Sequence, residues 1–405
     1  MNMQKNITTP TSYSKPWILL LALLTSLGPL SIDMYLPALP EMAMDLGVST
    51  QMISNTLPAY FLGLALGQLI YGPVSDRIGR KKPLYFGLSL YVVASLMCYF
   101  AQNEWSLIAA RTLQALGGCV GVVIARATIR DRLDVQSSAQ AFSSMMIVMG
   151  IAPILAPTIG AWILGFFSWH AVFGFLAFMG CVCLFCVHFF FKESLPTSRR
   201  LELSFKQVLQ LYATIYRDKR FLYPMLIGCF SGGILFCYIS ASASILMVDF
   251  AMSQQHFAYA FGFNAFGIML LSTLNNVLAN KTTVYGRLKL GLSIQSFGVL
   301  VLLLSAVFVQ SLPLVMLGMF CAVSGIGLTG PNAMAFAMSH QGARAGTASA
   351  IMGSMQFACG LLGGVILNFL MWSAQLNMAV LMLGFVAVAF MAYRYMRIDQ
   401  QRTAS

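Results

Sequence analysis

The chain alternates between long stretches without any charged side chain and short segments in which the charges gather. The uncharged stretches cover residues 46–75, 83–103, 135–191, 221–248, 290–343 and 345–393. About 20 apolar residues suffice for a helix to cross a bilayer, so the longest stretches must hold two spans each. Divided at turn signals, the pattern predicts twelve helices, at residues 17–38, 52–71, 83–101, 105–126, 139–164, 170–191, 222–247, 257–279, 288–309, 313–338, 345–369 and 377–396.

The positions of the cations indicate a polytopic membrane protein. Of the 24 Lys and Arg residues, all but Arg111 lie in every second connection between these spans, whereas Glu41, Asp45, Glu104 and Asp249 lie in the other connections. Cationic loops stay on the cytoplasmic face, so both termini are expected there. Soluble helical domains do not repeat uncharged stretches of this length. We therefore predict an all-α polytopic membrane protein with twelve transmembrane helices.

The net charge and the cysteine content argue against other classes of protein. The net charge of +12 follows from membrane orientation and does not indicate a nucleic-acid partner, because basic loops meet anionic lipid headgroups. The first apolar stretch is too long for a signal peptide and is expected to remain as helix 1. Cys181, Cys183, Cys186 and His188 share one predicted helix but point to different faces, so no metal site is predicted. Nothing indicates a disulfide framework.

The chain divides near its middle into two similar parts. We predict a cytoplasmic tail at 1–16, a six-helix half at 17–191, a linker at 192–221, a second six-helix half at 222–396 and a tail at 397–405. The linker contains an amphipathic stretch that is expected to lie along the cytoplasmic interface. Gly79-Arg80 and Gly286-Arg287 hold equivalent places in the two halves. Duplicated halves around a central site are typical of transporters.

Three motifs carry a family resemblance. The segment Gly72–Lys82 resembles the Gly-x-x-x-Asp-Arg-x-Gly-Arg signature of the major facilitator superfamily, and Arg111–Gly118 resembles its helix 4 pattern. Helix 5 resembles the antiporter motif of that superfamily, although Ala156 and Ala161 stand where glycines are common. The antiporter motif residues are Gly150, Pro153, Pro157 and Gly160.

Helix 1 narrows the resemblance. Ser31–Pro40 is similar to the helix 1 signature of the Bcr/CflA drug-resistance transporters, and so are Gly67–Pro73, Ser168–His170, Lys192–Pro196 and Ala345–Ser349 in their places. The likeness covers essentially the whole chain. It implies a multi-pass protein of the bacterial inner membrane, a proton antiporter that exports bicyclomycin, phenicols or sulfonamides. It also implies a proton gradient as the driving force, without ATP or another cofactor.

Asp33 and Arg111 are the candidate proton-coupling pair. Asp33 is the sole acid well inside a predicted span, and both residues lie about 9 Å from the outer ends of their helices at 1.5 Å per residue. They could meet in one cavity. An ionisable side chain inside a membrane is costly unless it faces water or a partner, which favours a functional role. A structural ion pair is the alternative.

The predicted substrate cavity combines hydroxyl, amide and glycine positions on several spans. Gln114, Gly118 and Gly121 continue the Arg111 face of helix 4. Polar residues in spans can equally hold helices together, and this alternative stays open for each. The full set is Ser26, Tyr35, Gln114, Gly118, Gly121, Ser231, Tyr238, Ser242, Asn264 and Asn332.

A conformational latch is predicted in the loop after helix 2. In the superfamily this motif holds the two halves together on the cytoplasmic side, and the start of helix 11 offers Asp76 the positive end of a helix dipole. The alternative is that the cations serve topology alone. The latch residues are Gly72, Asp76, Arg77, Gly79, Arg80, Gly346 and Thr347.

The sequence thus predicts a proton-driven antiporter rather than an enzyme. It shows no nucleophile elbow and no phosphate loop. The single deep acid is opposed by a fixed cation, so the cavity is near neutrality and should favour neutral or zwitterionic amphiphilic drugs. The expected partners are such a substrate, protons and membrane lipids, with the protein a monomer. A proton-coupled symporter and an exporter of an endogenous metabolite remain alternatives, and a non-transport membrane protein is less favoured.

Overall fold

The computed structural model describes residues 15–133, 151–200, 205–279, 281–339, 341 and 344–404, and all regular elements there are helices. The first part of the chain forms α1 (Lys15–Asp33), η1 (Leu36–Ala38), α2 (Leu39–Asp45), α3 (Thr50–Ser54), α4 (Thr56–Ile78), α5 (Lys81–Tyr99), α6 (Glu104–Arg132), a helical segment Ile151–Leu164, α8 (His170–Phe190) and η2 (Thr197–Arg199). The second part forms α9 (Phe205–Arg217), α10 (Lys219–Ala243), a π-helical turn η3 (Ser244–Asp249), α11 (Gln254–Leu278), α12 (Val284–Val307), α13 (Leu312–Ser324), α14 (Ile326–Ser339), α15 (Ala345–Phe369) and α16 (Ala374–Ala404).

The described residues contain 10 helical segments that are long and apolar enough to cross a membrane. They include the pair α13 and α14 as one segment, Leu312–Ser339. Besides these, α5 packs against α6 and α8, and there is a shorter apolar helix at Ile151–Leu164. The protein is therefore an all-helical, multi-pass membrane protein, as predicted.

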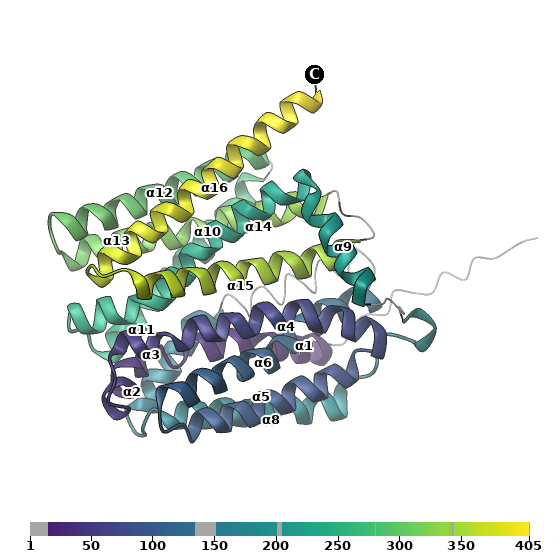
Figure 1. The fold of residues 1–405 in the computed structure, drawn as a ribbon, viewed down its shortest axis with the longest axis horizontal. Helices are drawn as coiled ribbons and strands as arrows, with labels where there is room; N and C mark the ends of the chain where they lie inside the picture. The colour runs from purple at the N-terminus through teal and green to yellow at the C-terminus, as the bar shows by residue number, and fades with distance from the viewer. Residues whose placement is uncertain are drawn as a thin grey trace, which may run out of the picture.

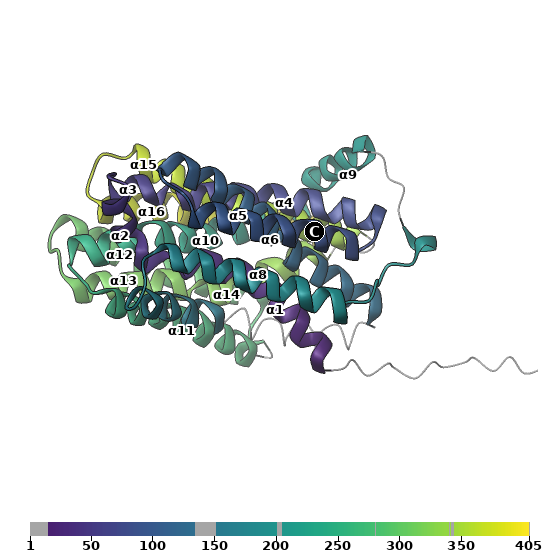
Figure 2. The same ribbon diagram turned by 90° about the horizontal axis from the view of Figure 1, so that it is seen from below.

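The helices run roughly along the long axis in two groups (Figure 1). The first group contains α1, α4, α5, α6 and α8, and the second contains α10 to α16, of which α11 and α15 lie where the groups meet. Figure 2 shows α9 at one end of the bundle, where it packs against α10 and α15. The helices α2 and α3 lie at the opposite end. We call these the α9 end and the α2–α3 end.

The two groups touch most closely where α4 packs against α15. Ser354 Oγ donates to the carbonyl of Ala65 at 2.9 Å. A Cβ on Gly353 would clash with the Gln68 side chain, and a Cβ on Gly364 would lie 2.3 Å from Pro58. Small residues on one helix thus allow the backbones to approach. Because Pro58 faces Gly364 while Gln68 faces Gly353, the helices are antiparallel.

Helix 1 is shorter than the predicted span of residues 17–38. The α-helix ends at Asp33, and the chain continues as the short η1 helix. Pro37 explains this boundary, because it has no N–H to donate to the Asp33 carbonyl and its ring disfavours helical geometry before it. The interruption places the Asp33 carboxyl at a helix end rather than in mid-helix.

Candidate functional site

Asp33 is a buried carboxyl group at the break of α1. It is 3% exposed, and its Oδ1 atom has no hydrogen-bond partner among the described residues. It lies within electrostatic range of the Tyr238 phenol on α10, in the other helical group. A buried polar atom without a partner carries a desolvation cost, so such a group usually has a function.

Two predicted cavity residues, Tyr238 and Asn264, bond each other, and α11, which carries Asn264, packs against η1 just after Asp33. Asn264 Nδ2 on α11 donates to Tyr238 Oη at 2.9 Å, and the Tyr238 ring stacks on Phe261 with 5.3 Å between centroids. The Asn264 Oδ1 atom is buried without a partner in the described part of the chain. The structure therefore joins Tyr238 to Asn264, and it places the Tyr238 phenol within electrostatic range of Asp33.

Arg111 is fully buried and is enclosed by aromatic rings. Its guanidinium carbon lies 4.2 Å from the Tyr60 ring centroid, 4.3 Å from that of Tyr35 and 5.7 Å from that of Phe173. Its Nη1 atom donates to Gln114 Oε1 at 2.6 Å, and Gln114 Nε2 donates to Ser95 Oγ at 2.8 Å. Ring quadrupoles stabilise a desolvated cation, and three aromatic rings surround this guanidinium.

Asp33 and Arg111 form no ion pair in this structure. Within the described ranges, the ion pairs join Arg80 to Asp76 and to Asp131. The static ion pair that the sequence left as an alternative is thus absent from this conformation. The aromatic partners Tyr60 and Phe173 were not among the predicted residues, since no periodicity relates rings on α4 and α8 to an arginine on α6.

The glycines of α6 serve close packing. A Cβ on Gly121 would lie 2.2 Å from the carbonyl oxygen of Leu24 on α1, and one on Gly118 would lie 3.1 Å from the Tyr91 ring. Tyr91 in turn shares a 2.7 Å hydrogen bond with Ser31. Ser26 donates to the Leu23 carbonyl of its own helix at 2.9 Å. Of these positions, Gly118 lies nearest the aromatic surroundings of Arg111.

The remaining cavity candidates lie in separate networks. Ser231 donates to Gln295 Oε1 at 2.9 Å and also bonds Thr329, which joins α10, α12 and α14. Ser242 is buried, and its hydroxyl has no partner among the described residues. Asn332 bonds Arg287 and Asn275 in a third cluster nearer the α9 end.

The predicted latch loop is organised around Arg80. Its Nη1 atom lies 2.6 Å from Asp76 Oδ1 and donates to Ser75 Oγ at 2.6 Å, while Nε donates to Asp131 Oδ2 at 2.9 Å. Burial lowers the pKa of Arg80, but its bonds to Asp131 and the charge of Asp76 raise it overall. Asp131, in the segment Arg130-Asp131-Arg132, was missed because its neighbours indicated only topology.

Glu193 completes this loop from a distant part of the chain. Its carboxylate accepts from the backbone N–H groups of Arg80 at 2.9 Å and Lys81 at 3.1 Å, at the start of α5. Burial raises the pKa of Glu193, but its bonds to the N–H groups of Leu195, Arg80, Lys81 and Ser194 lower it overall. Gly79 has a φ of +94°, and a Cβ there would lie 2.6 Å from Glu193 Oε2. This position therefore favours glycine for two reasons.

The other predicted latch residues border this cluster. Arg77 is exposed, and Gly72 has open space where a Cβ would stand. Gly346 and Thr347 lie in the first turn of α15, which starts at Ala345. The antiparallel packing of α4 and α15 carries Asp76 toward this turn.

The antiporter motif packs against the segment after Asp33. A Cβ on Gly160 would overlap the carbonyl oxygen of Met34, and Pro157 is buried. Pro153 is half-buried on the same helix, and Gly150 lies outside the described residues. Ile154 approaches Gly262 on α11, so this helix also contacts the other group.

The chain belongs to the major facilitator superfamily, whose family description matches residues 21–364. It is a transporter of small molecules and not an enzyme. It is 28% identical over 380 residues to the bicyclomycin resistance protein homolog of Haemophilus influenzae, covering 94% of this chain and 96% of that protein. It is 32% identical over 354 residues to YdgK of Bacillus subtilis, an uncharacterized MFS-type transporter, with 86% of each covered.

Further similarities agree with this family. Multidrug resistance protein MdtL of Escherichia coli is 31% identical over 235 residues, which cover 58% of this chain and 59% of MdtL. A D-xylose-proton symporter structure superposes with a TM-score of 0.75 at 14% identity, over 95% of this chain and 97% of that one. The resemblance to drug-resistance transporters of the Bcr type is confirmed, and the solved structure confirms the fold.

Proposed function

We propose that this protein is a proton-driven antiporter that exports small neutral or zwitterionic amphiphiles from the cytoplasm. The observation that carries the proposal is the Asp33 carboxyl, which is buried at a helix break, has its Oδ1 unbonded among the described residues and lies within electrostatic range of Tyr238 in the other helical group. Relative movement of the groups would change its surroundings, which is the requirement for taking up a proton on one side and releasing it on the other. The drug-resistance relatives support export.

The proposed topology has twelve spans in two six-helix domains, with α5 and the helix ending at Leu164 completing the first. The α9 end would be cytoplasmic, because it holds the Arg80 cluster and the linker between residues 192 and 221. The bacterial relatives support the inner membrane as the location. We expect a monomer.

In the proposed cycle, outward opening lets Asp33 take up a proton and release substrate, and inward opening lets it release the proton. Arg111 is the fixed cation toward which Asp33 moves in the deprotonated state. The Arg80 cluster would hold the closed cytoplasmic side until Asp76 separates from the start of α15. The charges at this depth of the predicted spans, the acid Asp33 against the cation Arg111, support uncharged substrates over permanent cations.

Drug susceptibility and vesicle transport test the proposal. Cells that express the protein should tolerate phenicol or bicyclomycin better than cells with an empty vector, and a protonophore should remove the difference. In vesicles, exchange of one proton for one neutral molecule moves one charge, so the membrane potential and the pH gradient should each drive export. Proton and substrate movement in the same direction would favour a symporter, and strong export of quaternary cations would contradict the substrate class.

A further inference from the structure

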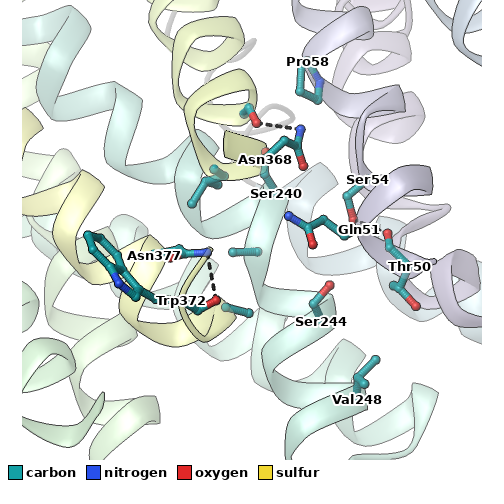
Figure 3. A pocket seen from close by; sticks show the side chains of 14 residues that line it. Thr50, Gln51, Ser54, Pro58, Ser240, Ser244, Val248, Asn368, Trp372 and Asn377 are labelled. Atoms are coloured by element: carbon teal, nitrogen blue, oxygen red, sulfur yellow. Dashed lines mark hydrogen bonds between the residues drawn. The ribbon is translucent and has the colours of Figure 1, made fainter. Parts of the chain in front are cut away.

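A cavity lies between the two helical groups at the α2–α3 end (Figure 3). Its volume is about 280 Å³, and its walls come from α3 and α4 on one side and from α10, α15 and α16 on the other. The lining contains no charged side chain. It offers hydroxyl and amide groups beside an indole, namely those of Gln51, Ser240, Ser244, Asn368, Asn377 and Trp372.

Two polar atoms of this lining have no partner among the described residues. Ser240 is 7% exposed, and its Oγ atom is unbonded. Asn377 is 5% exposed, and its Oδ1 atom is unbonded. The Asn377 Nδ2 atom donates to the carbonyls of Leu370 at 2.9 Å and Trp372 at 3.2 Å, which fixes the orientation of the amide (Figure 3). Buried polar atoms normally have partners, and both residues belong to the cavity wall. Each of the two atoms has less than 1 Å² of accessible surface in this structure, so it reaches the cavity only when its side chain rotates.

The backbone of α10 changes form along this cavity. The α-helix gives way to the π-helical turn η3 at Ser244. Such turns are rare and occur mostly at functional sites. Ser240 lies one turn before Ser244, so both side chains face the cavity from adjacent turns.

The cavity is distinct from the surroundings of Asp33 and Arg111, since neither residue lines it. One wall takes part in the contact between the groups. Asn368 Nδ2 on α15 bonds Asn55 Oδ1 just before α4, and it also donates to the Gly364 carbonyl at 3.0 Å. Because α4 and α15 belong to different groups, any separation of the groups at this end alters the cavity.

We propose that this cavity is a second binding site, for uncharged molecules that combine hydrogen-bonding groups with an aromatic or other apolar ring. The ligand would exchange hydrogen bonds with Ser244 and, once its hydroxyl rotates into the cavity, with Ser240, and it would pack its ring on Trp372. An ion would lose its hydration here without a compensating charge. Only the choice of compound class rests on the proposed export function. In that function, this site would hold the molecule after it leaves Asp33.

Fluorescence of Trp372 tests the site directly. The full-length protein in lipid nanodiscs would be titrated with chloramphenicol, a neutral nitroaromatic compound that quenches nearby indoles. We expect a saturable quench that is absent in Trp372→Phe. Ser240→Leu, which fills the cavity, should weaken binding at least about tenfold, and Ser240→Ala about threefold through the lost hydrogen bond. Ser296→Leu is the control, because the Ser296 hydroxyl bonds the Leu292 carbonyl of its own helix at 2.9 Å, on α12.

The outcomes separate this site from the export function. Absence of a saturable, Trp372-dependent quench overturns the site, whether or not the protein exports the compound. Equal displacement by tetraphenylphosphonium would overturn the preference for uncharged ligands. If the unsubstituted protein shows the quench but exports nothing, the site is retained and the antiporter proposal fails. A quench that persists in Asp33→Asn shows that the site does not depend on the deep acid. If Ser240→Leu does not fold, the threefold change in Ser240→Ala and the comparison with Trp372→Phe still decide whether the site binds the compound.

Discussion

Acidic side chains are divided unequally between the two helical groups. Residues 219–404 contain two acids, Asp249 and Asp399. Residues 15–193 contain Asp33, Glu41, Asp45, Asp76, Glu104, Asp131, Asp134 and Glu193. The first group therefore holds most of the carboxylates, and the second group contributes mostly hydroxyl and amide groups to its networks.

The two copies of the Gly-Arg loop show this difference at equivalent places. Arg80 pairs with the carboxylates of Asp76 and Asp131. Arg287 donates instead to Asn332 Oδ1 at 3.1 Å and to the carbonyls of Ala279 and Thr282 at 3.1 and 3.0 Å, near the end of α11. The same residue thus joins charged helices in one group and caps a neutral helix end in the other.

This difference between carboxylate and neutral partners indicates which of the two helical groups can respond to protons. An ion pair is weakened when an acid is protonated or moves away, whereas hydrogen bonds to carbonyls do not depend on pH in the physiological range. We infer that the first group carries coupling and latching and that the second supplies a stable surface for substrate. Substitutions that equalise the two groups test this division.

The largest effect is expected from Asp33→Asn, which removes the deep acid. A single charge moved through 100 mV is worth about 2.3 kcal/mol, so coupled export can hold roughly a fiftyfold gradient that should fall to about one in the variant. Vesicle accumulation of chloramphenicol measures it. Asp33→Glu, which keeps an acid, should retain some coupling, and Asn264→Leu in the second group should change only affinity. If the Asn variant still concentrates substrate, the proton site lies elsewhere.

Arg111→Ala should separate the coupling site from the latch. Loss of the desolvated cation from its aromatic surroundings is expected to lower coupled export about tenfold, because cation–π contacts of this kind contribute up to about 2 kcal/mol. Asp76→Asn should leave substrate affinity within about twofold and slow turnover, since it acts only on the closed state. Equilibrium binding and transport rate, measured on both variants, distinguish them. Equal losses of affinity would contradict the division.

The two loop arginines, Arg80 and Arg287, can be compared by the stability that is lost when each is replaced by Met. Arg80→Met leaves two carboxylates close together without a cation and should cost about 3 kcal/mol. Arg287→Met leaves backbone carbonyls and one amide unbonded and should cost about 1–2 kcal/mol. Denaturation in detergent measures both, and Arg77→Met is the control because Arg77 is exposed. Added salt should reduce the loss of stability in Arg80→Met and leave the loss in Arg287→Met unchanged. An equal salt response would show that the two loops do not differ electrostatically.

The sequence predicted what depends on local pattern. The span at residues 345–369 coincides with α15, because an uncharged run flanked by Arg344 and a turn defines both ends. The burial of Asp33 and Arg111 followed from their positions inside apolar runs. A charge that cannot reach the interface must lie inside the protein.

What the sequence did not predict depends on contacts between distant segments. The rings of Tyr60 and Phe173 reach Arg111 from helices that are far apart in the chain. Likewise, Asp131 and Glu193 meet Arg80 from segments 51 and 113 residues away. No periodicity relates such positions, and only the packing of α4, α5, α6 and α8 brings them together. The cavity beside Trp372 is also a product of packing between the groups.

The smallest effect on stability is expected at the starts of α5 and α12. Helix α5 follows the pair Gly79-Arg80, and α12 contains the pair Gly286-Arg287. Glu193 caps α5 with a carboxylate, whereas α12 is capped by the Thr283 hydroxyl, which accepts from Gly286 N at 3.1 Å. The pKa of Glu193 is lowered in the folded protein, so its stabilisation is complete above the ordinary glutamate pKa and is lost as the pH falls through the lowered value.

Glu193→Gln should therefore lower the melting temperature by about 1 °C at neutral pH, and the difference from the unsubstituted protein should shrink below about pH 4. Thr283→Val should lower it by a similar amount that does not change with pH, because a hydroxyl cap carries no titrating charge. Thermal unfolding of both variants between acidic and neutral pH decides the matter. A pH-independent effect of Glu193→Gln, or a pH-dependent effect of Thr283→Val, would mean that the two loops respond to protons alike and that the functional asymmetry lies only at Asp33.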